Sequence, residues 1–225
     1  MPFVVAIDGP AGTGKGTITK LVAQDLGLLN VDTGAIYRCV TLEVLNKGLN
    51  LEENKQEIID LVDELKIEIK NDNGKQTIFL NGENVTDEIR TPRVTNFVSQ
   101  TSSIVEVRLK VTEIERSFGK ENNIIMEGRD IGTYVFPNAD VKIYLDASPE
   151  ERAKRRFLQN KEKGINTPYE QLLEEINQRD YNDMHKEIGS LCVAEDAIVV
   201  DTTTMTIDEV KNRVKEIIQN TRKGD

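Results

Sequence analysis

Five short runs of apolar residues recur along the 225-residue chain, and each ends in an acidic residue or a turn signal. Runs of this length are typical of parallel strands that are buried on both faces. The runs are FVVAID (3–8), LLNVD (28–32), NIIMEG (123–128), VKIYLD (141–146) and AIVVD (197–201). Segments with helical spacing of apolar residues lie between or after them, at 15–26, 35–46, 105–118, 149–163, 169–184 and 207–219. This alternation predicts an α/β fold in which helices flank a five-stranded parallel sheet.

One segment breaks this alternation. Residues 66–90 alternate polar and apolar side chains around the turn signals DNG and NG, a pattern typical of an antiparallel hairpin or meander. We therefore expect a small antiparallel sheet inside an inserted subdomain at about 48–104. Residues 1–47 and 105–225 would then form the core.

Charge and composition argue against several classes of partner. Thirty-nine acidic and twenty-nine basic residues give a net charge of −10, which repels nucleic acid and anionic membranes at long range. No segment offers the ~20 apolar residues that span a bilayer, and the N-terminus lacks a secretion signal. Cys39, Cys192 and the single histidine, His185, do not have metal-type spacing. We expect a reduced, cytoplasmic protein in which any anionic ligand meets a local basic pocket.

The most specific motif, GPAGTGKGT, directly follows the first apolar run and precedes a predicted helix. This is the setting of a loop that binds phosphate through backbone N–H groups, and the alternative is a glycine-rich turn without a ligand. Lys15 could reach the β- and γ-phosphates of a nucleotide. Serine or threonine usually follows this lysine, but here Gly16 intervenes before Thr17. Thr17 could lie near an α-phosphate or a magnesium-bound water, or be an ordinary first-turn residue.

The rest of the chain separates this loop from those of GTP-operated switches. No aspartate is followed by glycine three residues later, and NKEK (160–163) lacks the final aspartate of a guanine-binding motif. Small-molecule kinases instead need a second anion pocket, where donor and acceptor phosphates meet away from water. Arginines that could build one stand in VDTGAIYR (31–38), EGRDIG (127–132), ERAKRR (151–156) and QRDYND (178–183). Each segment follows a predicted strand or lies in a helix leaving the sheet, where parallel sheets bind ligands.

Helical residues near the C-terminal end of the core have two interpretations. Arg179 and Asp183 are four residues apart and project from one helix face, either into a ligand site or as a solvated ion pair. His185 could suggest a general base. An acceptor phosphate is already ionised near neutral pH, so we expect His185 to be an ordinary helix residue.

The residues after the third and fourth apolar runs also have more than one interpretation. Arg152, Arg155 and Arg156 begin a helix, where a lid over donor phosphates would hinge, or form a solvated basic face. Glu127 and Asp130 flank Arg129. Glu127 could hold a magnesium-bound water or orient the arginine, or it could simply cap a turn.

Six segments, in order and at appropriate spacing, resemble the bacterial cytidylate kinases. They are DGPAGTGKGT, VDTGAIYR, EGRDIGTYVFP, VKIYLDAS, ERAKRR and RDYND, and the likeness covers essentially the whole chain. It implies a P-loop kinase with an inserted nucleoside-monophosphate (NMP) subdomain at 48–104 and a short lid at about 151–168. It also implies transfer of the γ-phosphoryl group from magnesium-bound ATP to CMP or dCMP by a monomeric protein.

The resemblance also assigns residues to each nucleotide. The catalytic residues would be Lys15, Arg129, Asp130 and Arg179. ATP would contact Gly9, Pro10, Ala11, Gly12, Thr13, Gly14, Lys15, Gly16, Thr17, Arg152, Arg155 and Arg156. The acceptor would contact Thr33, Tyr37, Arg38, Ser99, Arg108, Arg129, Asp130, Arg179, Asp183 and Lys186. Among these, Ser99, Arg108 and Asp130 would read the cytosine edge, whose N4 amino group suits an aspartate acceptor. Thr17 and Asp32 could hold Mg²⁺ through water.

The chain departs from the family pattern at two places. Lys186 stands where many relatives carry arginine, and GSL (189–191) follows where SPL is familiar. An ammonium keeps the charge but loses the bidentate fork of a guanidinium. Two other functions stay open: another nucleoside monophosphate kinase, acting on UMP and CMP or on AMP, and a regulatory module that binds ATP without turnover.

Overall fold

The computed structural model describes residues 2–72, 75–162 and 164–224. Its strands are β1 (Val4–Asp8), β2 (Leu29–Asp32), β3 (Ile67–Asp72), β4 (Lys75–Leu80), β5 (Glu83–Asn84), β6 (Ile124–Glu127), β7 (Val141–Asp146) and β8 (Ile198–Asp201). Its α-helices are α1 (Lys15–Leu26), α2 (Thr33–Asn46), α3 (Lys55–Glu64), α4 (Pro92–Thr95), α5 (Val98–Thr101), α6 (Val105–Glu121), α7 (Pro149–Glu162), α8 (Tyr169–Met184) and α9 (Ile207–Gly224). A 3₁₀-helix, η1 (Glu88–Arg90), and a π-helix, η2 (Ile131–Val135), complete the order.

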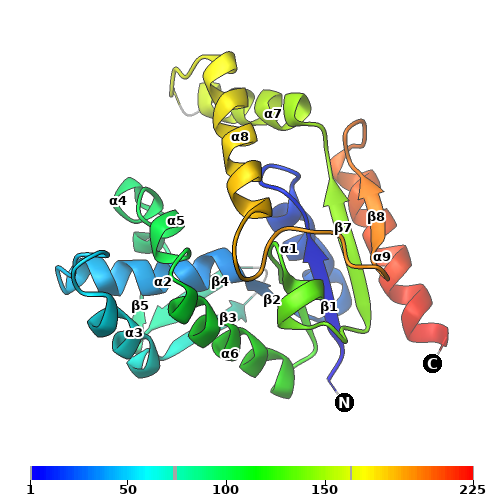
Figure 1. Ribbon diagram of the computed structural model, residues 1–225. Helices are drawn as coiled ribbons and strands as arrows, with labels where there is room; N and C mark the ends of the chain where they lie inside the picture. Colours follow the sequence, from blue (N-terminus) through cyan, green and yellow to red (C-terminus); the bar gives the residue numbers. More distant parts are fainter. Residues whose placement is uncertain (1, 73–74, 163, 225) are drawn as a thin grey trace. The chain divides into compact units, whose positions relative to one another are not determined.

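The five predicted apolar runs form one sheet, in the order β2-β6-β1-β7-β8 (Figure 1). β1 pairs with β7 in parallel, with Val5 opposite Val141, and β7 pairs in parallel with β8. The expected α/β fold with a five-stranded parallel sheet is confirmed. The chain leaves β1 toward one edge of the sheet and later returns to build the other. The carboxyl end of β1 is therefore at the kind of crevice where open α/β sheets bind ligands.

Residue contacts divide the chain into two compact units. Unit 1 comprises Met1–Pro2 and Leu29–Ile124, and unit 2 comprises Phe3–Leu28 and Ile125–Asp225. Unit 1 is wider than the segment 48–104 that we expected as the insertion. The reason is that α2 packs against α4, α5 and η1, and α6 packs against α3.

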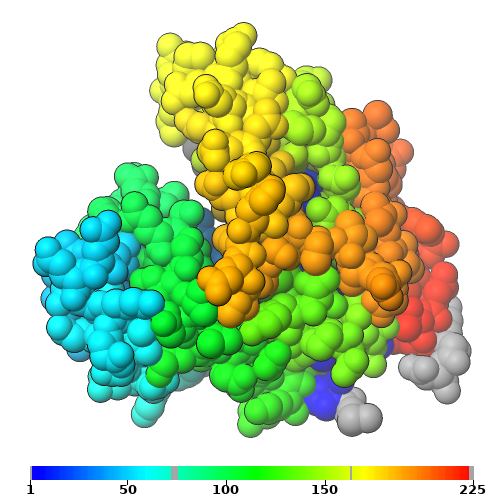
Figure 2. Space-filling view, in the orientation of Figure 1, coloured from blue at the N-terminus to red at the C-terminus, as the bar shows by residue number. Residues whose placement is uncertain are grey.

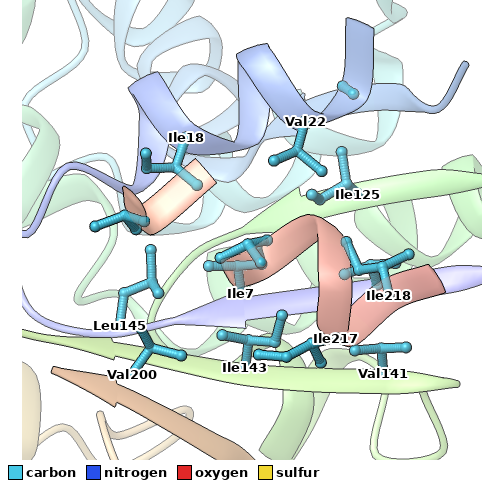
Figure 3. Packing of buried hydrophobic residues seen from close by; sticks show 14 of the residues in the cluster. Ile7, Ile18, Val22, Ile125, Val141, Ile143, Leu145, Val200, Ile217 and Ile218 are labelled. Carbon is cyan, nitrogen blue, oxygen red and sulfur yellow. The ribbon is translucent and has the colours of Figure 1, made fainter. Parts of the chain in front are cut away.

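The core of unit 2 lies between its strands and two helices, α1 and α9. Figure 3 shows Ile18 and Val22 of α1 near Ile7 of β1, while Ile217 of α9 lies close to Ile143 of β7. These side chains are at most 5% exposed. Burial of such side chains contributes about 1.5–3 kcal/mol each relative to exposure, which makes the sheet a rigid base for the loops at its edge.

β8 corrects one expectation. We expected all five apolar runs to be buried strands, but in β8 only Val200 is buried, while Ile198 and Val199 are 43% and 53% exposed. β8 is the last strand of the sheet, so it lacks a neighbour on one side. Its apolar sequence marks a strand correctly without implying full burial.

The helices begin and end close to the predicted bounds. α2 begins two residues earlier than predicted, at Thr33, because the Asp32 carboxylate accepts a hydrogen bond from the Ala35 N–H at 3.2 Å. α9 extends to Gly224, five residues beyond the predicted end. In the part of the chain that the structure describes, no helix is both long and apolar enough to cross a membrane.

Unit 1 contains the predicted antiparallel sheet, in the order β3-β4-β5. Ile69 of β3 lies opposite Ile78 of β4, and both are buried. The NG signal forms the turn after β4, where Asn81 and Gly82 have φ of 52° and 88°. The other turn signal includes Asn73 and Gly74, which lie outside the described residues.

Helices α7 and α8 pack against each other within unit 2. The expected lid, at about 151–168, covers most of α7 and the turn into α8, apart from residue 163, which lies outside the described residues. Leu158 and Ile165 in this segment are 49% and 51% exposed. Figure 2 shows this yellow-green to yellow segment on the molecular surface, and its role as a lid stays a prediction.

Candidate functional site

The phosphate loop joins β1 to α1, as its sequence predicts. Its backbone turns through positive φ at Gly9, Gly12 and Gly14, a conformation that glycine adopts without strain. Lys15 begins α1, is 5% exposed and folds back over the loop. Its ammonium donates to the Gly9 and Pro10 carbonyls at 2.6 and 2.7 Å. To reach a phosphate, the ammonium must exchange these carbonyls for the ligand.

The position of Gly16 has little room for the serine or threonine that usually follows the lysine of a phosphate loop. A Cβ at this position would lie 2.8 Å from the Glu127 Oε1 atom at the end of β6. Such a separation forces one of the two groups to move. The Glu127 carboxylate therefore occupies space next to the position where other loops carry serine or threonine.

We expect Gly16→Ala to weaken ATP binding by about 10-fold, because the added methyl group displaces either the loop or Glu127. Calorimetric titration with a non-hydrolysable ATP analogue measures this change. Combining Gly16→Ala with Glu127→Asp, which shortens the carboxylate arm, should recover part of the loss. Additive losses in the double variant would contradict the proposed crowding.

Positive charges converge on Lys15. Burial, followed by the nearby charge of Arg129, lowers the pKa of Lys15 to about 7, and Arg179 acts in the same direction. The carboxylates of Glu127 and Asp8 oppose this shift. Mutually repelling cations with a strongly perturbed pKa are typical of a site that binds an anion.

Asp183 forms ion pairs with two cations, Arg129 and Lys186. Its Oδ2 accepts from Arg129 Nε at 2.8 Å, and its Oδ1 pairs with the Lys186 ammonium at 2.9 Å. Burial would raise the pKa of Asp183, but Arg129 and Lys186 outweigh it and hold the pKa below its ordinary value. Asp183 is 7% exposed, so it is not a solvated helix residue. Lys186 thus supplies one ion pair where a guanidinium could supply two parallel bonds.

Asp130, Arg179 and His185, which the sequence also singled out, lie in η2 and α8 or at their ends. Asp130 is buried at the N-terminal end of η2, and Arg179 is exposed on α8, where its charge reaches Lys15. His185 is the C-cap of α8, is exposed and stacks on the Tyr181 ring at 4.0 Å, as expected of an ordinary residue.

The arginines of α7 differ from one another. Arg152 is 3% exposed and donates to both carboxylate oxygens of Asp180 and to the Ala11 and Ala147 carbonyls. Here it supports the phosphate loop from within the protein, and its expected contact with ATP stays a prediction. Arg155 donates to the Thr202 carbonyl at 2.6 Å, and Arg156 is exposed.

Unit 1 carries the sequence-predicted residues around the start of α2. Thr33 and Tyr37 are buried, and Arg38 follows on the same helix. A Cβ on Gly34 would lie 3.0 Å from Asp32 Oδ1 and 3.1 Å from an Arg38 terminal nitrogen, so both groups crowd the helix start. The buried Arg38 Nε has no hydrogen-bond acceptor among the described residues. A buried guanidinium nitrogen in this condition fits an anionic ligand.

Ser99 and Arg108 lie in α5 and α6 of the same unit. Arg108 is 5% exposed, lies over the Tyr37 ring at 5.6 Å and donates to the Ser102 carbonyl at 3.5 Å. Ser99 is exposed, and its carbonyl accepts from the Ser102 and Ser103 hydroxyls at 3.0 and 2.8 Å. The structure therefore brings Arg108 next to Tyr37, while their assignment to the acceptor stays a prediction.

Among the buried carboxylates of unit 2, sequence reasoning missed Asp8 and Asp180. Asp8 ends β1 and accepts hydrogen bonds from Ile131 and Gly132, while Asp180 pairs with Arg152. Asp8 could have been singled out from the sequence, because it is an acidic residue at the end of an otherwise apolar strand. Asp180 had none, because an aspartate beside Arg179 on a charged helix is indistinguishable from a solvated residue.

Comparisons with known proteins agree with this geometry. The family model for cytidylate kinase matches residues 5–220. A cytidylate kinase from Caldicellulosiruptor saccharolyticus is 52% identical over 213 residues, which cover 95% of this chain and 94% of the relative. Another, from Lactobacillus gasseri, is 47% identical over 220 residues, or 98% and 95% of the two chains. An uncharacterized protein from Eubacterium ventriosum shares the fold, with a TM-score of 0.50 at 9% identity over 96% of this chain and 98% of that chain. This chain belongs to the cytidylate kinase family.

Proposed function

We infer that this chain transfers the γ-phosphoryl group of ATP to CMP or dCMP, giving ADP and CDP or dCDP. The observation that carries this function is the arrangement in unit 2, where Lys15 folds back over the phosphate loop, the charges of Arg129 and Arg179 act on it, and Asp183 holds Arg129 at 2.8 Å. A donor loop alone would need one cation. Three neighbouring cations suit a site where the triphosphate of a donor meets the monophosphate of an acceptor.

The transfer needs positioning and charge neutralisation more than proton chemistry. An oxygen of the acceptor phosphate forms a bond to the γ-phosphorus while the bond from that phosphorus to the β,γ-bridging oxygen breaks, so ADP leaves with the electron pair. Lys15, released from the Gly9 and Pro10 carbonyls, neutralises charge on the transferred group. Arg129, oriented by Asp183, and Arg179 do the same for the acceptor phosphate.

We propose that Mg²⁺ enters with ATP. The Glu127 carboxylate beside Gly16 and the exposed Thr17 at the start of α1 are oxygen donors suited to magnesium or its water molecules, and Asp32 stays a further proposed water-mediated contact. When bound, the ion neutralises charge on the β- and γ-phosphates. The residues of the chain hold the loop and the carboxylates in place for it.

The assignments to the acceptor base and sugar are also proposals. Asp130 would accept from the cytosine amino group, and Arg108 and Ser99 would donate to its ring and carbonyl acceptors. Asp183 and Arg179 would contact the sugar. The burial of Asp130 and Arg108 supports these roles, because a desolvated hydrogen bond discriminates strongly between bases.

We further propose that the protein acts as a cytoplasmic monomer with nucleotides as its ligands. The net charge of −10 supports the absence of nucleic acid among its partners.

A panel of acceptors tests the proposed function. Purified protein with magnesium-bound ATP is mixed with CMP, dCMP, UMP or AMP, and each diphosphate product is quantified. We expect kcat/KM for CMP or dCMP to exceed that for UMP by at least about 10²-fold, because uracil leaves Asp130 without its donor. A preference for UMP or AMP would reassign the acceptor.

A further inference from the structure

Asp8 ends β1 and directly precedes the phosphate loop. It is 5% exposed, and its Oδ1 and Oδ2 atoms accept hydrogen bonds from Ile131 N–H at 2.8 Å and Gly132 N–H at 2.7 Å. These are the first two residues of η2, and the N–H groups at a helix start lack intrahelical acceptors. Asp8 therefore caps η2 from the strand that carries the donor loop.

Gly132 packs so closely against Asp8 and Lys142 that little room is left for a side chain. A Cβ on residue 132 would lie 3.3 Å from Asp8 Oδ2 and 3.2 Å from two carbons of Lys142. A side chain at this position would push its own backbone N–H away from the carboxylate. The glycine of GRDIG thus serves the contact with Asp8.

The turn that Asp8 caps directly follows the two acceptor-side residues, Arg129 and Asp130. η2 is a π-helix, a rare type that frequently occurs at functional sites. Asp130 has φ −141° and ψ 22°, between the strand and helix regions, and its carbonyl accepts from Tyr134 and Val135. The carbonyls at the start of η2 are thus bonded within the turn, while Asp8 supplies the acceptors for the N–H groups of its first two residues.

We propose that Asp8 is a positioning residue that holds the start of η2, so that Arg129 and Asp130 meet the acceptor nucleotide in one orientation. This role rests on the proposed function, and it goes beyond it by tying the acceptor-reading turn to the strand of the donor loop. The link lies wholly within unit 2.

Other charged groups surround Asp8, so its hold on the start of η2 depends on whether the Asp8 carboxylate is ionised. Asp130 and Lys15 act on it directly, Lys142 packs against Gly132, and Tyr144 lies opposite Asp8 on β7. Burial raises the pKa of Asp8 to about 6, and Asp130 adds to the rise, while the Gly132 and Ile131 hydrogen bonds and Lys15 oppose it. The ionised carboxylate accepts both bonds, whereas the protonated form turns one oxygen into a donor.

Kinetics of Asp8→Asn test the role. We expect this variant to raise the KM for CMP about 10-fold and to lower the CMP-over-UMP ratio of kcat/KM to a similar extent, with the KM for ATP within about threefold. The ratio is independent of how much protein is folded. A raised CMP KM with an unchanged ratio would still support the role, through Arg129 alone. Unchanged CMP parameters, or equal losses for ATP and CMP, would overturn it.

Asp140→Asn is the matched control. Asp140 Oδ2 accepts from Val4 N–H at 2.7 Å at the opposite end of β1, so this variant makes the same carboxylate-to-amide change beside the same strand but away from the turn. We expect its kinetic parameters to stay within about twofold of the wild-type protein.

An amide titration tests the contact without using turnover. In the wild-type protein, the Ile131 and Gly132 amide resonances should titrate with a midpoint at about pH 6, and this inflection should be lost in Asp8→Asn. If wild-type protein forms no CDP, the proposed function falls, and the titration still decides whether Asp8 holds the turn. Ile131 and Gly132 amide resonances that are the same in the wild-type protein and in Asp8→Asn would overturn the inference.

Discussion

Replacing Lys15 by methionine should lower kcat by about 10³-fold, the largest effect we expect from a single substitution. The ammonium is the cation of the donor loop, and the charges of Arg129 and Arg179 act on it. Methionine is close in length but cannot neutralise the transferred phosphoryl group. Steady-state assays at saturating ATP and CMP measure the loss.

The same variant should be at least as stable as the wild-type protein at pH 6. Burial lowers the pKa of Lys15 from 10.5 to about 7, so between these values the folded protein binds fewer protons than the unfolded chain. Wild-type stability should therefore rise with pH in this range, and the advantage of Lys15→Met should be largest below pH 7 and shrink above it. Chemical denaturation at several pH values checks the sign. A variant that is both inactive and much less stable at pH 6 would point to a structural role for Lys15.

Truncating Asp183 to alanine should lower kcat/KM for CMP by about 10²–10³-fold while leaving the ATP dissociation constant within about threefold. The change leaves Arg129 and Lys186 without the carboxylate that they share at 2.8 and 2.9 Å, and it frees the Arg129 side chain to leave its position. Acceptor kinetics and ATP titration calorimetry separate the two effects. Equal weakening of ATP would place Asp183 on the donor side instead.

Glu216→Ala provides the comparison for Asp183. Glu216 forms an ion pair with Arg213 at 2.7 Å, but both side chains are about half exposed. Exposed pairs contribute about 0–1 kcal/mol, so this variant should match the wild-type protein in both assays. A similar kinetic loss in Glu216→Ala would indicate a general sensitivity to the removal of ion pairs.

The sheet could be predicted from sequence because its signal is local. Each strand of the five-stranded sheet is a short apolar run, and the loop after β1 has a spacing that few other structures need. The exposed face of β8 could not be predicted, because its position at the sheet edge depends on the order of strands. Helix α3 carries apolar Ile58, Leu61 and Val62 at helical spacing. The sequence pattern could therefore have predicted this helix, although our sequence analysis did not include it.

The site was only partly predictable, because its charges are paired across long sequence separations. Arg129 and Asp183 are 54 residues apart, and Asp8 and Gly132 are 124 apart. Neither pairing leaves a periodic signal in the sequence. Arg152 shows the same difficulty, since its burial against Asp180 depends on how α7 packs on α8. The residue types indicated a phosphate-binding site, but only the tertiary packing shows which of these side chains pair with each other.

Phosphorus NMR of the reaction mixture tests the central claim most directly. With magnesium-bound ATP and CMP, we expect CDP and ADP to appear in equal amounts, and no ADP to form when CMP is left out. Water competes poorly at a site built for two facing phosphates, so inorganic phosphate should stay at background. ATP that is bound but never converted, or ADP and inorganic phosphate released without CDP, would contradict phosphoryl transfer to CMP.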